Sequence, residues 1–140
     1  MKTKLLALFL LISTFAFSQK YFTSYQVQSG RYNKYTKEWS WSESQDQEID
    51  IKLNGSTIYI YNKTNTVIYT YENFDEKTDY DKDGDRFKMN TWRAYDDKQR
   101  KCLFIMIHYT DIPLIIYSVV YGDTGFRFYI KKNQLSNFKP

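Results

Sequence analysis

The sequence has 140 residues, with 20 Lys or Arg against 16 Asp or Glu and a formal net charge of +4. Two of the lysines lie in an apolar N-terminal segment, so the rest of the chain has 18 basic against 16 acidic residues, a charge of +2. Proteins that bind nucleic acid concentrate basic residues on one face, and no such cluster appears, so nucleic acid is not an expected partner. A single cysteine leaves no internal disulfide, so packing must stabilise the fold.

Residues 1–18 have the pattern of a secretory signal peptide. Two lysines precede an apolar run over residues 5–17, and small residues at the end of the run suit cleavage after Ser18. The run is shorter than the roughly 20 residues of a membrane-spanning helix, so no membrane anchor is expected. The sequence therefore predicts a periplasmic or extracellular protein whose mature part, residues 19–140, is a single domain.

The first half of this domain alternates apolar with polar residues, which is the period of a half-buried strand. A first strand is expected at about 21–28, and Trp39 and Trp41 share one face of the next segment. Residues 49–53 alternate isoleucine and leucine with charged residues. The Asn54-Gly55 pair that follows predicts a hairpin with a type I′ turn, which needs positive φ at both central residues. Further strands are expected at 58–61 and 67–71.

A polar loop is expected at 74–86, before the strands of the second half. Met89 and Trp92 fall on opposite faces by parity, which we interpret as a β-bulge near Asn90-Thr91. Later strands are expected at 103–109, 114–121 and 126–130.

The mostly short connections favour pairing in sequence order, which makes an antiparallel meander of eight or nine strands. Twist accumulates along such a sheet and its edges invite pairing with other chains. We therefore expect an all-β domain that closes as a small barrel or half-barrel, with a two-sheet sandwich as the alternative.

The strands at 103–109 and 114–121 are apolar on both faces. They can lie centrally with the outer face partly covered, because short apolar runs are common inside sheets. Alternatively, one face lines a ligand cavity or forms a subunit interface, which would make the protein a homodimer.

The segment from Asp79 to Asp85 matches the D-x-D-x-D-G part of a calcium loop. Its carboxylates Asp79, Asp81, Asp83 and Asp85 are the candidate metal ligands. The motif lacks the bidentate glutamate and the flanking helices of an EF-hand. A calcium-stabilised loop of another kind and a solvated hairpin loop both remain open, since Asp and Gly are favoured in turns for backbone reasons alone. No other cofactor is expected.

No catalytic constellation is evident in the sequence. His108 is the only histidine and lies in an apolar strand, with no partner at the spacing of a metal site or a catalytic triad. We therefore expect a protein that is not an enzyme. The pair Trp39 and Trp41 could stack successive sugar rings or fill one end of the core.

The run Trp92-Arg93-Ala94-Tyr95-Asp96, Cys102 and residues 115–121 resemble a pattern in small uncharacterised exported proteins of Bacteroidota, as does the segment 15–19 at the end of the signal. The resemblance covers about a third of the chain. It implies export and a calycin-like (lipocalin-like) β-barrel, and it carries no functional residues over.

Our first hypothesis is an exported, non-enzymatic protein that binds a small apolar or amphipathic ligand in such a barrel. The expected contacts are Trp39, Trp41, Trp92 and inward residues of the late strands, Phe104 and Tyr117. A cavity of a few hundred Å³ would be the usual scale for such a ligand. The alternative is a surface-binding module for glycans or a protein partner, with exposed aromatic residues and calcium at 79–85.

Overall fold

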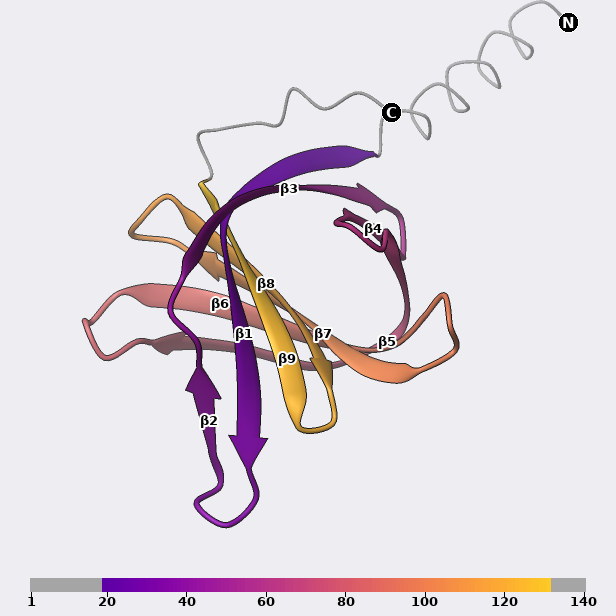
Figure 1. Cartoon of the computed structure of the whole chain (residues 1–140). Helices are drawn as coiled ribbons and strands as arrows, with labels where there is room; N and C mark the ends of the chain where they lie inside the picture. Colours follow the sequence, from indigo (N-terminus) through magenta and orange to yellow (C-terminus); the bar gives the residue numbers. More distant parts are fainter. Residues whose placement is uncertain (1–18, 132–140) are drawn as a thin grey trace, which may run out of the picture.

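The computed structural model describes residues 19–131, and these form an all-β structure without a helix (Figure 1). The predicted signal peptide, residues 1–18, lies outside the described residues. The strands are β1 (Lys20–Asn33), β2 (Glu38–Trp41), β3 (Gln45–Asn54), β4 (Thr57–Tyr61), β5 (Thr66–Tyr80), β6 (Arg86–Asp96), β7 (Lys101–Tyr109), β8 (Leu114–Tyr121) and β9 (Thr124–Lys131).

All strand pairings are antiparallel, and from β3 to β9 each strand pairs with the next one along the chain. An additional pairing between β1 and β9 closes the sheet into a ring. The predicted meander and its closure are therefore confirmed. The ring is uneven: β5 and β6 share a long ladder, whereas β4 contributes only five residues. Figure 1 shows the β5–β6 hairpin extending beyond the neighbouring strands.

β1 closes the ring because it pairs with three strands. Along one edge, residues 20–27 pair with β3 and residues 30–33 pair with β2. Along the opposite edge, residues 26–31 pair with β9. β2 and β3 therefore act as one interrupted strand beside β1, and eight strand positions complete the ring.

The turn between β3 and β4 differs from the prediction. Asn54 pairs with Thr57, so Gly55 and Ser56 are the two central residues. Only Gly55 has positive φ, at 60°. Positive φ at the first central residue alone, with glycine there, is the requirement of a type II′ turn, so the predicted type I′ turn centred on Asn54-Gly55 is wrong.

Two further expectations about the middle of the chain are wrong. The predicted polar loop at 74–86 is strand as far as Tyr80 and again from Arg86, because β5 pairs with β6 from Ile68 to Tyr80. The predicted bulge at Asn90-Thr91 is absent, since β6 pairs with β7 without interruption. The register shifts lie in β5 instead, where Tyr71 and Phe74 are the extra residues.

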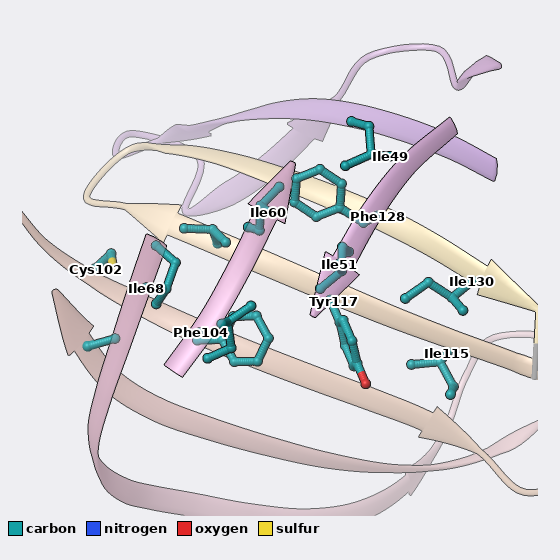
Figure 2. Close-up of a cluster of buried hydrophobic side chains, with 13 residues drawn as sticks. Ile49, Ile51, Ile60, Ile68, Cys102, Phe104, Ile115, Tyr117, Phe128 and Ile130 are labelled. Carbon is teal, nitrogen blue, oxygen red and sulfur yellow. The ribbon is translucent and has the colours of Figure 1, made fainter. Parts of the chain in front are cut away.

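The interior of the ring is filled by alternate residues of the strands (Figure 2). Isoleucines from β3, β4 and β5 meet aromatic residues from β7, β8 and β9. The fully buried members include Ile51, Ile68, Phe104, Tyr117 and Ile130. Cys102 is buried and packs in the same core cluster.

Candidate functional site

A cavity of about 510 Å³ opens at one end of the barrel. Alternate turns of a meander fall at the same end, so the β4–β5, β6–β7 and β8–β9 turns meet there. The inner wall is apolar and continues into the core. It consists of Val27, Ile49, Ile60, Val119 and Phe128, and the more exposed Phe126 extends the apolar lining outward. The rim is polar and consists of Gln47, Asn62, Lys63, Thr64, Thr66, Arg100, Tyr121 and Thr124.

The charged residues that line this cavity are both cations, Lys63 and Arg100. Asp97 and Asp123 belong to the same group of turns but do not line it. The sequence analysis missed these two cations. The signal that could have found them is the meander itself, because it brings the turn at 62–65 to the same end as the turn at 97–100.

A buried carboxylate orients one of these cations. Asp96 is only 1% exposed and accepts four hydrogen bonds. The backbone N–H groups of Lys98 and Arg100 donate to its Oδ1 at 3.0 and 2.8 Å. Arg100 Nε and the Tyr121 hydroxyl donate to its Oδ2 at 2.8 and 3.0 Å. The guanidinium of Arg100 also lies over the Tyr121 ring, 4.8 Å from its centroid.

These contacts change the proton affinity of the groups involved. Burial alone would raise the pKa of Asp96, but the four donors together hold it below the ordinary value of an aspartate. The hydrogen bond from Arg100 raises the pKa of that guanidinium further. Both groups are therefore charged at neutral pH, and the rim of the cavity has a fixed cation.

A second cavity, of about 290 Å³, lies beside the β3–β4 turn. It is lined by Leu53, Gly55, Ser56, Ile58, Thr70, Trp92, Phe104 and Met106. Two of the predicted ligand contacts, Trp92 and Phe104, thus lie together on its wall, with ring centroids 6.2 Å apart.

Tyr117, a third predicted contact, is buried in the core beside this cavity. Its ring contacts Phe104 at 5.6 Å and Phe22 at 5.7 Å between centroids. Its hydroxyl is buried and has no hydrogen-bond partner among residues 19–131, and burial raises its pKa. Asn90 Oδ1 is likewise buried without a partner in the described part of the chain. Native proteins satisfy such atoms with ordered water or a ligand.

The other two predicted contacts, Trp39 and Trp41, are in β2 and line neither barrel cavity. Their rings stack at 5.4 Å, Tyr32 contacts Trp39 at 5.5 Å, and the Arg127 guanidinium lies 3.6 Å from the Trp41 ring centroid. Trp41 packs over Gly30, where a Cβ atom would come within 2.6 Å of the ring. Trp41 also borders a groove of about 500 Å³ with Gly30 and Gly125.

The candidate calcium ligands lie at the tip of the β5–β6 hairpin. Asp81 Oδ1 accepts the backbone N–H groups of Asp83 and Asp85 at 3.0 and 2.9 Å. Asp79 Oδ1 accepts the N–H of Tyr80. Within residues 19–131, no three His, Cys, Asp or Glu side chains are gathered as metal ligands. Asp81 thus holds the turn through backbone hydrogen bonds, and these lower its pKa.

Four of the exposed aromatic residues of β5 and β6 are here called the outer aromatic strip. They are Tyr69, Tyr71, Phe74 and Tyr95. Tyr95 contacts Tyr69 at 5.4 Å and Tyr71 at 6.1 Å between ring centroids. Tyr71 is 60% exposed, so the strip presents aromatic surface to solvent.

A scan against protein-family models, a search of the curated proteins and a search of the solved structures each found no match for this chain. Between residues 19 and 131, no helix is long and apolar enough to span a bilayer.

Proposed function

We propose that this protein is an exported, non-enzymatic carrier that binds one small apolar or amphipathic molecule in the mouth of its barrel. The observation that supports the proposal most directly is the 510 Å³ cavity with an apolar inner wall and a polar rim. Ligand sites are typically concave, about 300–1,000 Å³ in volume and mostly apolar, with a few polar groups that fix orientation.

The wall of the cavity supports an apolar occupant in particular. Ile49, Ile60, Val119 and Phe128 are core residues whose inner surfaces face the cavity. A ligand that covers them gains roughly 25 cal/mol for each Å² of apolar surface removed from water. No covalent chemistry is part of the proposal. The only thiol, Cys102, is buried, and desolvation raises its pKa to about 11, so it is a poor nucleophile at neutral pH.

The proposal is tested by titrating the purified protein with N-phenyl-1-naphthylamine, an uncharged probe that fluoresces when it leaves water. We expect saturable binding at one site. Thr66→Phe should weaken binding at least tenfold, because Thr66 lines the cavity and the larger side chain fills it. The control is Val67→Phe, since the next residue of β5 faces the opposite side of the sheet.

Comparing the two variants distinguishes probe binding in the cavity from probe binding to other apolar surfaces. Equal effects of the two substitutions, or no saturable binding by the wild-type protein, would refute a ligand site in the barrel mouth. Circular dichroism of both variants establishes that each is folded.

The outer aromatic strip favours a second candidate, a surface-binding module for a glycan or a protein partner. Aromatic faces in contact with solvent can stack on sugar rings or enter a partner's pocket. A glycan array probed with wild-type protein and with Tyr71→Ser, in buffers with and without calcium, tests this candidate. Binding that is lost in the variant, while N-phenyl-1-naphthylamine binding persists, would favour the surface module.

A further inference from the structure

We propose, building on the proposed function, that the ligand of the barrel mouth is an anionic amphiphile whose head group binds to Arg100 and Lys63. The molecule would carry a carboxylate or a similar anion at one end of a single apolar chain. The inference comes from the sign and position of the charges around the 510 Å³ cavity.

The first argument is charge complementarity. Among residues 19–131, the lining of the cavity contains two cations and no acid. Asp96 offsets part of the charge of Arg100, but it lies behind the guanidinium, is buried, and has both oxygens occupied by donors. Lys63 is exposed and makes no ion pair among the described residues. Asp97, on the same turn, also acts on the charge of Arg100. An incoming anion therefore meets the charge of Lys63 and the remaining N–H donors of Arg100, and this lining favours an anion over a cation.

The second argument is that Arg100 is held in place before any ligand arrives. Its Nε is bound to Asp96 at 2.8 Å and its guanidinium rests on the Tyr121 ring. Of the five N–H donors of a guanidinium, those on the two terminal nitrogens have no partner within residues 19–131. A planar donor pair of this kind matches a carboxylate, and its fixed orientation reduces the entropy lost on binding.

The third argument is the separation of polar and apolar parts. The cations lie on the turns at the rim, whereas the inner wall is built from Ile60, Val119, Phe128 and their neighbours. Phe126 stands at the opening, 43% exposed. A ligand with its anion at the rim and its chain against this wall keeps the charged group partly in water, so the cost of desolvating it stays small.

The test compares three ten-carbon probes that differ only in the head group: decanoate, decan-1-ol and decylamine. Each displaces N-phenyl-1-naphthylamine from the purified protein at pH 7 and low ionic strength. We expect decanoate to bind at least tenfold more tightly than decylamine, with decan-1-ol between them. Raising the salt concentration should weaken the binding of decanoate and leave the binding of decan-1-ol unchanged, because salt screens exposed charges.

Two substitutions at Lys63 test the residues without disturbing the core. Lys63→Gln should weaken decanoate about two- to fivefold, the range of one exposed ion pair, and leave decan-1-ol unchanged. Lys63→Glu should weaken decanoate further and strengthen decylamine. Lys98→Gln is the matched control, since Lys98 is exposed on the β6–β7 turn but does not line the cavity.

The outcomes distinguish this inference from the function on which it rests. Three results would refute an anionic head group without refuting the carrier function: equal binding of the three probes, a preference for decylamine, or an unchanged preference in Lys63→Glu. Failure of all three probes and of N-phenyl-1-naphthylamine to bind would overturn the carrier itself.

Discussion

Asp96 is a charged side chain within a barrel built mainly from isoleucine, valine and aromatic residues. It tolerates burial because four donors surround its two oxygens. The same contacts close the β6–β7 turn, where Gln99 has positive φ at 62° and its N–H donates to the Asp96 carbonyl. One carboxylate therefore stabilises a tight turn and orients the cation at the cavity rim.

Replacing Asp96 with Asn should lower the free energy of unfolding at pH 7 by about 2 kcal/mol, because hydrogen bonds to a buried charged group are replaced by weaker ones. The native contacts hold the pKa of Asp96 below its unfolded value, so its stabilisation is complete above about pH 4 and is lost as the pH falls through the native pKa.

Urea unfolding at pH 7 and pH 3 measures both effects. The difference between wild type and Asp96→Asn should be smaller at pH 3, because the carboxylate of the unfolded wild-type chain, with an ordinary pKa of about 3.9, is then mostly protonated and favours unfolding. Asp97→Asn, on the same turn, is the control and should change little at either pH. A difference that grows toward pH 3 would contradict the argument.

At the scale of elements, β2 is a short strand that pairs with the end of β1, and its Trp41 ring packs on the outer face of the ring. Gly30 and Gly125 pair across β1 and β9 and make room for the Trp41 ring. The Arg127 guanidinium lies over the same ring. The alternation Trp39-Ser40-Trp41-Ser42 is typical of a strand whose apolar face points into the core. These contacts explain why Trp41 instead lies on the outer surface.

Gly30→Ala should destabilise the protein by about 1–3 kcal/mol, the usual cost of overpacking, because the new Cβ atom would lie 2.6 Å from the Trp41 ring. The displaced ring should also shift tryptophan emission to longer wavelength. Gly125→Ala is the matched control, since its Cβ would meet its nearest neighbours at 3.4 Å. Chemical unfolding followed by fluorescence measures both quantities, and equal effects at the two glycines would refute this role of Gly30.

At the scale of the whole molecule, closure joins the first strand to the last. The Tyr129 hydroxyl donates to Gln28 across 101 positions of sequence. Val27 pairs with Phe128 at the same seam, and Phe128 is buried in the core. Contacts so distant in sequence form only after much loop entropy has been lost, so we expect slow, cooperative folding.

Phe128→Ala should lower the free energy of unfolding by about 3–5 kcal/mol, as for other buried aromatic residues, which is a large part of the roughly 5–15 kcal/mol of a typical domain. Phe126→Ala, two residues earlier on β9 and half-exposed at the cavity mouth, should cost much less. Equilibrium unfolding in urea compares the two variants. Similar losses of unfolding free energy would show that the buried contacts of Phe128 at the β1–β9 pairing are not what stabilises closure.

Strands whose two faces differ could be predicted from the sequence, because alternation depends only on which residues enter the core. The strand that carries Ile49 and Ile51 is of this kind. Closure of the sheet could be predicted separately, because the edges of a long meander have to be covered. The extension of β5 could not be predicted in this way. Residues 71–80 are exposed on both faces, so they carry no alternation, and only pairing with β6 makes them strand.

None of the five predicted ligand contacts lines the 510 Å³ cavity. The parity of Trp92 and Phe104 places them inside the ring, but there they line the second, smaller cavity. The outward position of Trp41 depends on two glycines in other strands, and the rim cations Lys63 and Arg100 depend on which turns meet. Both depend on how strands and turns that are distant in sequence come together, and the local pattern of residues does not determine this.

The long β5–β6 hairpin has a consequence for self-association. Beyond Thr70, the edge of β5 away from β6 pairs with no other described strand. An open edge is a template on which a second molecule can add a strand. This edge is rich in charge, with Glu72, Asp75, Glu76, Lys77 and Asp79, and it is interrupted by two register shifts. Charge and irregularity at a strand edge oppose fibril-like stacking, so this hairpin can expose aromatic rings to solvent while its backbone is protected from pairing with other copies.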